Sequence, residues 1–247
     1  MPLPEPTLSG LREGLSEALS ELLDGYLIQA ESNEQSEDSP HLLVETFKQL
    51  FEAMHSTEAG QHAGEPPGGE GVSELGEYAL ELFEQTLGWA ERLKLPEVYQ
   101  NLQLHTISMA RWIAAHDGEI HSLEQVVDAL ARLANTSQEP DELLELYEAM
   151  GEITAATADI IRQDLEKTNP GRPWRVLHMN RAIVATRTHQ PDAMDAAFQD
   201  LVKNLPEEAS QFFTEGMEQM DLLNYPPHVR EVMDRYYKKW SIDRSLH

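Results

Sequence analysis

The spacing of apolar residues constrains this chain more than any other feature of its sequence. Within residues 8–26, apolar side chains recur every three or four positions, and charged residues lie between them. This period places the apolar side chains along one face of an α-helix. The members of this stripe are Leu8, Leu11, Leu15, Leu19, Leu22 and Tyr26. The same period returns along the chain, and valine-rich alternating runs are missing, so the sequence predicts an all-α fold.

Prolines mark where several of the expected helices begin, because proline fits the first helical turn. Pro96, Pro140, Pro173, Pro191 and Pro227 each stand near such a start. The expected helices cover 8–26, 41–57, 73–90, 96–115, 120–134, 140–167, 173–188, 191–204, 207–222 and 227–240.

Glycine and proline gather between residues 58 and 72, a composition typical of a linker or loop. The sequence therefore predicts three parts. Acidic helices occupy residues 1–57, the linker or loop covers 58–72, and a domain similar to helical repeats covers 73–247.

Short amphipathic helices that start at prolines resemble the tetratricopeptide-like helical-repeat superfamily over roughly residues 73–240. The stretch from Pro140 to Tyr147 is echoed by that from Pro191 to Phe198, with proline, aspartate and an aromatic residue at matching offsets. Four of these prolines, Pro96, Pro140, Pro191 and Pro227, are 44, 51 and 36 residues apart in turn, whereas that repeat keeps close to about 34 residues. The resemblance implies a right-handed α-solenoid of antiparallel helix pairs, and an irregular multi-helix bundle is the alternative.

Charge and composition exclude several classes of function. The 247 residues include 44 acidic and 18 basic side chains, a net charge of −26. Such a chain lacks the clustered Lys and Arg that contacts with nucleic-acid phosphates or an anionic membrane need. It has no cysteine, which excludes disulfides, cysteine-bound metal centres and a thiol nucleophile. With no secretory signal and no long apolar run, we expect a cytoplasmic protein.

Common catalytic motifs are also missing, so we predict a protein that is not an enzyme and has no cofactor. Two groups of His and carboxylate residues keep a metal-dependent enzyme as an alternative, since these residue types bind hard or borderline cations. The competing interpretations are an exposed helix end for the first group and helix capping by Asp117 and Glu119 for the second. The groups are Glu52 with His55, and His116, Asp117, Glu119 and His121.

The most unusual segment is basic. Residues 162–187 hold six basic and two acidic side chains, a net charge of +4 in a strongly acidic chain. Helical spacing puts Arg181 on a stripe with Leu177 and Val184, so its guanidinium projects from an apolar face. Because an unpaired buried charge costs several kcal/mol, we expect an anion to meet Arg181.

That anion has two candidate sources. Acidic residues of the same chain would form internal ion pairs. Alternatively, a protein or peptide partner presents an acidic side chain or C-terminal carboxylate in a groove, which suits the planar fork of arginine. Tetratricopeptide-like domains use Asn, Lys and Arg in this way, and the leading hypothesis is a non-enzymatic interaction module or adaptor. The predicted partner-binding residues are Arg172, Arg175, His178, Asn180, Arg181 and Arg187.

The N-terminal region supports two further hypotheses. Residues 1–90 hold 18 acidic and two basic side chains, so an acidic mimic that binds a basic partner is another alternative. The acidic region can also fold back on the basic segment and mask it. The apolar stripe within residues 8–27 either packs as ordinary core or pairs with a second copy of the chain to form a homodimer.

Overall fold

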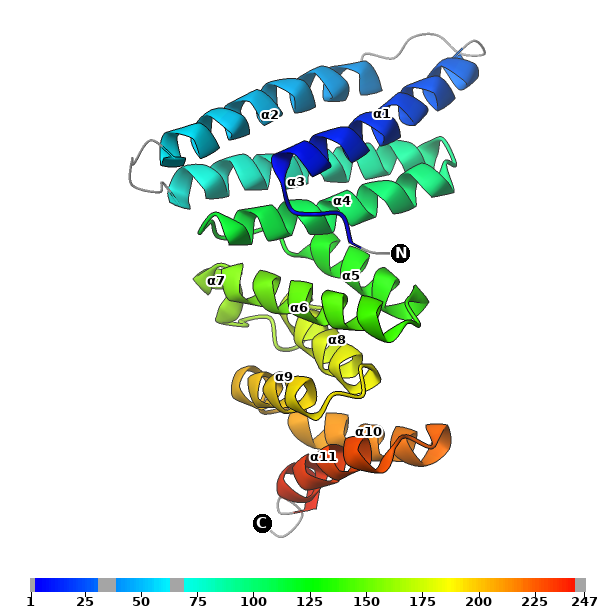
Figure 1. Cartoon of the computed structure of the whole chain (residues 1–247), viewed down its shortest axis with the longest axis vertical. Helices are drawn as coiled ribbons and strands as arrows, with labels where there is room; N and C mark the ends of the chain where they lie inside the picture. Colours follow the sequence, from blue (N-terminus) through cyan, green and yellow to red (C-terminus); the bar gives the residue numbers. More distant parts are fainter. Residues whose placement is uncertain (1–2, 31–38, 63–68, 243–247) are drawn as a thin grey trace. The chain divides into compact units, whose positions relative to one another are not determined.

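The computed structural model describes residues 3–30, 39–62 and 69–242 (Figure 1). Over these ranges the chain is all-α, and its one β feature is an isolated bridge between Ile120 and Thr157. None of the described helices is long and apolar enough to cross a membrane.

The chain divides into two compact units. The N-terminal unit comprises the described residues before Ala131 together with Ala155–Ala158. The C-terminal unit comprises Ala131–Thr154 and the described residues from Asp159 onward. The division therefore runs through the helix at Glu124–Thr136.

Helices of the N-terminal unit are α1 (Leu8–Ala30), α2 (Pro40–His62), α3 (Gly69–Arg92), α4 (Pro96–Ala115) and the first part of α5 (Glu124–Thr136). The C-terminal unit contains most of α6 (Pro140–Ala156), then α7 (Asp159–Arg162), α8 (Pro173–Arg187), α9 (Pro191–Asn204), α10 (Ala209–Leu223), α11 (Pro227–Tyr237) and the π-helical turn η1 (Lys238–Ile242).

Helix starts follow the sequence closely. The five prolines that the sequence places near helix starts are each the first residue of a helix, namely α4, α6, α8, α9 and α11. Thr7 caps α1, because its hydroxyl accepts a hydrogen bond from the backbone N–H of Gly10 at 3.2 Å.

One expected helix, over 140–167, is wrong in its length. It ends at Ala156 because the next residues pair with Ile120 instead of continuing the helix. The Ile120 N–H donates to the Ala156 carbonyl at 2.8 Å, and the Ala158 N–H donates to the Ile120 carbonyl at 2.9 Å.

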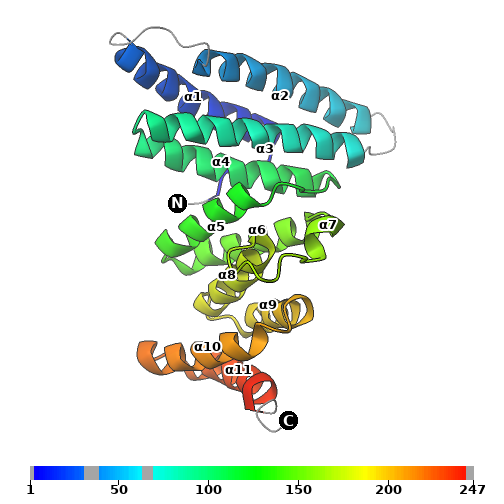
Figure 2. The ribbon, with the colours of Figure 1, turned by 180° about the vertical axis from the view of Figure 1, so that it is seen from behind.

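The structure divides the chain at a different place from the predicted linker. Residues 58–62 belong to α2 and 69–72 belong to α3, while 63–68 lie outside the described residues. In both views α1 and α2 lie against α3 and α4 (Figures 1 and 2). Phe47 of α2 meets Phe83 of α3 edge-on at 5.3 Å, so the acidic N-terminal helices share a core with the helices that follow. The apolar stripes of α1 and α2 need such a surface to be buried.

The apolar stripe of α1 packs inside its own unit. Its inner leucines, Leu11, Leu15, Leu19 and Leu22, are between 0 and 5% exposed. Gly14 lets α1 approach α4 closely, because a Cβ at this position would lie 2.2 Å from the ring of His105. This close packing fixes the position of α1. The apolar stripe of α1 is therefore part of the core of its own unit.

The core of the C-terminal unit gathers aromatic rings from three helices. Phe198 of α9, Phe213 of α10 and Tyr236 of α11 contact one another, with ring centroids 5.1–5.2 Å apart. The three side chains are buried in one core cluster, which holds α9, α10 and α11 together and packs against α8.

Candidate functional site

Helix α8 carries the predicted partner-binding residues. Pro173 opens it and Arg172 is its N-cap, while the other five predicted residues lie along its length. The residues that contact them all belong to the C-terminal unit, so the contacts of each predicted residue lie within that unit.

Arg172 is held inside the unit by a buried carboxylate. Its Nε and Nη2 donate to the two oxygens of Asp164 at 2.5 and 3.1 Å, and its Nη1 donates to the backbone carbonyls of Lys167 and Asn169. Arg172 is 3% exposed and Asp164 is 6% exposed. This bidentate pair ties the N-terminus of α8 to the loop before it.

Arg175 pairs with Glu208, which precedes α10. The Nη2 of Arg175 donates to Glu208 Oε2 at 2.8 Å, and its Nε lies 2.7 Å from Oε1. The hydrogen bond between them raises the pKa of Arg175 and lowers the pKa of Glu208. Both groups are therefore charged at neutral pH and form an ion pair within the unit.

Arg181 meets the anion that the sequence requires, and that anion belongs to the same unit. Its Nη1 donates to Asp200 of α9 at 2.5 Å, and its Nη2 donates to the hydroxyl of Tyr147 at 3.2 Å. The guanidinium also lies over the Tyr147 ring, 4.7 Å from the centroid. Gly151 of α6 leaves room for it, since a Cβ there would lie 3.2 Å from Nη2.

The remaining predicted residues differ in their surroundings. Arg187 donates to the carbonyls of Ala134 and Ser137, at the C-terminal end of α5. His178 is 2% exposed, and burial lowers its pKa to about 4, so it is neutral at pH 7 and does not attract an anion. Asn180 is half-buried.

The contacts of α8 thus correspond to internal ion pairing, the first of the two interpretations. Partner binding through these residues stays a prediction, and it would require a partner to displace carboxylates that the unit already supplies.

The predicted metal ligands do not converge. Among the described residues, no three or more His, Asp or Glu side chains are placed to hold a metal ion. His116 Nε2 lies 3.3 Å from Glu58, and His121 Nε2 lies 3.7 Å from Glu119. His55, of the other group, lines a cavity between α1 and α2.

This cavity has a volume of about 580 Å³, and a second cavity of about 350 Å³ adjoins it. Both are lined by Arg12, Ser16 and Phe51, so they form one depression along the seam between the two helices, which we call the α1–α2 groove. It is lined by Leu8, Ser9, Arg12, Glu13, Leu15, Ser16, Leu19, Ser20, Leu23, Val44, Phe47, Lys48, Phe51 and His55.

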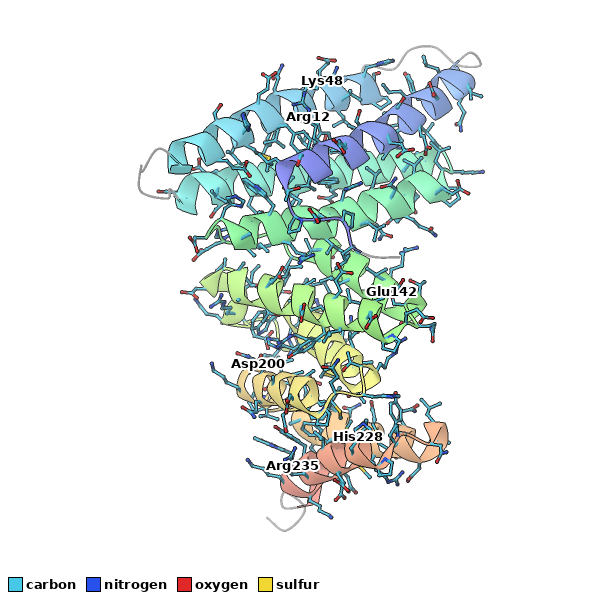
Figure 3. The ribbon with its side chains drawn as sticks, in the orientation of Figure 1. Arg12, Lys48, Glu142, Asp200, His228 and Arg235 are labelled. Atoms are coloured by element: carbon cyan, nitrogen blue, oxygen red, sulfur yellow. The ribbon has the colours of Figure 1, made fainter. Side chains whose placement is uncertain are left out.

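The groove combines an apolar floor with a cationic side chain at each wall. Leu15, Leu19 and Phe47 are buried and form part of the floor. Arg12 stands on α1 and Lys48 on α2 (Figure 3). Lys48 forms a pair with Glu45 at 2.7 Å, but both side chains are more than 60% exposed, so the pair is weak.

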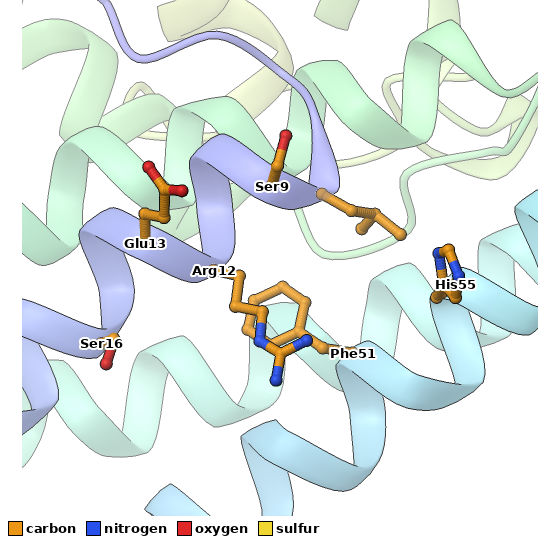
Figure 4. A pocket seen from close by; sticks show the side chains of 7 residues that line it. Ser9, Arg12, Glu13, Ser16, Phe51 and His55 are labelled. Atoms are coloured by element: carbon orange, nitrogen blue, oxygen red, sulfur yellow. The ribbon is translucent and has the colours of Figure 1, made fainter.

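Arg12 differs from every other arginine in the described part of the chain. The others each have a hydrogen bond, an ion pair or another polar or ring contact, whereas Arg12 has none there. Figure 4 shows its side chain pointing across the groove towards Phe51, and Glu13, the next residue of α1, also lines the groove. The groove therefore has an unpaired guanidinium beside an aromatic ring.

Sequence reasoning missed this groove, although one signal pointed to it. Arg12 and Lys48 are the two basic residues among the first 90, and both line it. Comparisons with protein-family models, with curated proteins and with solved structures gave no match. The case for a function therefore rests on the residues themselves.

Proposed function

We propose that this chain is a non-enzymatic protein–protein interaction module that holds an acidic segment of a partner protein in the α1–α2 groove. The observation that carries the proposal is the unpaired guanidinium of Arg12 at the edge of an apolar depression. Among the described arginines, Arg12 is the one without a hydrogen bond, an ion pair or a ring contact.

Physical chemistry favours an acidic occupant. A hydrogen bond to a charged group contributes about 1.5–3 kcal/mol when water is excluded around it. An occupant that covers Phe51 excludes water from Arg12 and strengthens such a bond. Arginine is also one of the residue types that contribute most to binding energy in protein interfaces.

The resemblance to tetratricopeptide-like repeats supports the same use. Those domains hold partner segments against Asn, Lys and Arg on the helices that line a groove. Along with this function we propose the solenoid of antiparallel helix pairs as the architecture, with the irregular bundle as its alternative.

A site-specific cross-linker tests the proposal directly. Ser16 is exposed and lines both cavities, so a photoreactive residue in its place reports on whatever occupies the groove. The full chain carrying this residue is irradiated in lysate of its source cells, and the captured segments are identified by mass spectrometry. We expect segments rich in Asp and Glu, and we expect Arg12→Glu to reduce their yield about tenfold.

The matched control is Lys203→Glu, which reverses the charge of an exposed lysine on α9 of the other unit. This control should capture the same segments as the unaltered chain. Capture that is equal with Arg12→Glu, or the absence of any specific segment, contradicts the proposal. Basic captured segments would instead favour the acidic-mimic alternative, and segments of the chain itself would favour the homodimer.

A further inference from the structure

We infer that the segment held in the α1–α2 groove is an amphipathic α-helix, with carboxylates on the edges of its apolar face that pair with Arg12 and Lys48. This inference rests on the proposed function and specifies the partner that the same groove accepts. It follows from the length of the groove, the chemistry of its walls and the positions of its two cations.

The groove has the length of a short helix. Its lining on α1 runs from Leu8 to Leu23, which corresponds to about 22 Å at the rise of an α-helix. A helix of about four turns covers this distance. Leu27 lies one turn beyond Leu23 on the same side of α1 and is 50% exposed, so the apolar surface continues past the groove.

The walls favour a helix over an extended strand. Both are α-helices, whose backbone groups are already hydrogen-bonded along their length, so the walls offer only side chains as partners to the backbone of a bound peptide. An extended peptide lying on this floor would leave much of its backbone without partners, at a cost for every buried group. A helix satisfies its own backbone and presents only side chains, which is the recognition mode of an apolar groove between helices.

The two cations set where the carboxylates must lie. Arg12 and Phe51 line both cavities, whereas Lys48 lines only the second, along with Ser20. The helices α1 and α2 run in opposite directions (Figure 1), so Lys48 lies one to two turns beyond Arg12 along the groove and on the opposite wall. Along the axis of the groove, one to two helical turns correspond to about 5–11 Å. A bound helix reaches both cations with carboxylates one to two turns apart, flanking its apolar stripe.

The test uses the full chain and two fluorescently labelled peptides of identical composition. One is an 18-residue amphipathic helix with glutamates flanking the apolar stripe, and the other carries the same glutamates on the far face. We expect the first to bind at least about tenfold more tightly by fluorescence anisotropy, and added salt to reduce the difference. A proline in the middle of the first peptide should abolish binding, because it breaks the helix.

A charge exchange separates specific pairing from general attraction. Arg12→Glu should lose about tenfold in affinity for the glutamate peptide and regain it with a peptide that has lysine at the flanking positions. Lys203→Glu, on the other unit, should behave as the unaltered chain does. Equal binding of the two isomers, tolerance of the proline, or failure of the exchange overturns the inference.

The outcomes distinguish this inference from the proposed function. If cross-linking captures acidic segments that depend on Arg12 while the two peptide isomers bind alike, the function stands and the helical partner is wrong. If the chain associates with itself and Arg12→Glu abolishes that association, a second copy occupies the groove. If the isomers bind alike and cross-linking is also independent of Arg12, both proposals fail.

Discussion

The arginines of α8 and the arginine of α1 have the same chemistry and opposite surroundings. On α8, Arg172, Arg175 and Arg181 each meet a carboxylate of the C-terminal unit, and Gly151 leaves room for Arg181. On α1, Arg12 faces a groove and meets no carboxylate among the described residues. These clustered arginines therefore have partners inside the fold, whereas the isolated Arg12 has none among the described residues, and we propose it as the partner-binding residue.

This difference shows how basic residues should be interpreted in the sequence of an acidic chain. Local enrichment of arginine draws attention, but a folded chain with excess acid supplies carboxylates to arginines that lie inside it. Exposure at an apolar depression, and the absence of a partner among the described residues, are the features that support the role proposed for Arg12. Four measurements test this comparison, from the largest expected effect to the smallest.

Loss of Arg172 should give the largest change in stability. Arg172→Met leaves Asp164 buried without its partner, and breaking a buried ion pair in this way costs about 3–5 kcal/mol. Chemical denaturation followed by circular dichroism measures the loss, and hydrogen exchange should place it at α7 and α8. The double variant Arg172→Met with Asp164→Asn should recover part of it. A loss below about 1 kcal/mol would show that the pair does not hold α8, and would weaken the structural role assigned to this region.

Helix α8 and the surroundings of α1 each contain a buried histidine. Both histidines should make the free energy of unfolding depend on pH. Burial lowers the pKa of His178 on α8 and of His105, which contacts Gly14 of α1, to about 4 in each case, against 6.5 in the unfolded chain. Between these values the unfolded chain binds more protons, so stability is fully present above pH 6.5 and falls as the pH drops towards 4. Each histidine should cost about 2 kcal/mol between pH 7 and pH 5.

The variants His178→Gln and His105→Gln remove this titration from one unit at a time. The free-energy difference between each variant and the unaltered chain should shrink by that amount as the pH falls. A difference that is the same at both pH values would mean that the histidine is not desolvated in the folded unit. Desolvation by burial is the largest cause of the lowered pKa at both sites. It is the only cause at His105, whereas charges on Asp200, Arg181 and Asp164 also act on His178.

Local structure was predictable from the sequence because its causes are local. Apolar spacing and proline positions lie within one helix. They predicted both ends of α4 and α9, the start of α8 with an end one residue too late, and the start of α1, which continues four residues beyond its expected end. The break at Ala156 was not predictable in this way, because it depends on Ile120, which is 36 residues away.

The candidate site shows the same limit. The need of Arg181 for an anion follows from its place on an apolar face, but its partner Asp200 lies on another helix and no periodicity identifies it. The α1–α2 groove arises from two helices packed together, so the sequence could indicate only the two basic residues that line it.

Arg181 should rank third, because its partner is only half-buried. Arg181→Met removes the bond to Asp200 and the contact with Tyr147, but Asp200 is 45% exposed on its side chain and regains water. We expect a loss of about 1–2 kcal/mol in the free energy of unfolding. The yield of segments cross-linked at the position of Ser16 should not change. A large drop in that yield would return the binding role to α8 and reverse the comparison.

Arg12 should give the smallest change in stability and the largest change in binding. Arg12→Met removes a side chain that is exposed and has no partner in the described chain, so the free energy of unfolding should change by less than about 0.5 kcal/mol. The same variant should bind the peptide with flanking glutamates several-fold more weakly, because methionine covers the apolar floor but offers no charge. The two measurements must be compared. Replacing a binding residue lowers the affinity for the peptide and leaves the free energy of unfolding nearly unchanged, whereas replacing a structural residue lowers the free energy of unfolding. If Arg12→Met destabilises the chain as much as Arg181→Met does, then Arg12 has a structural partner and the distinction between the two regions is lost.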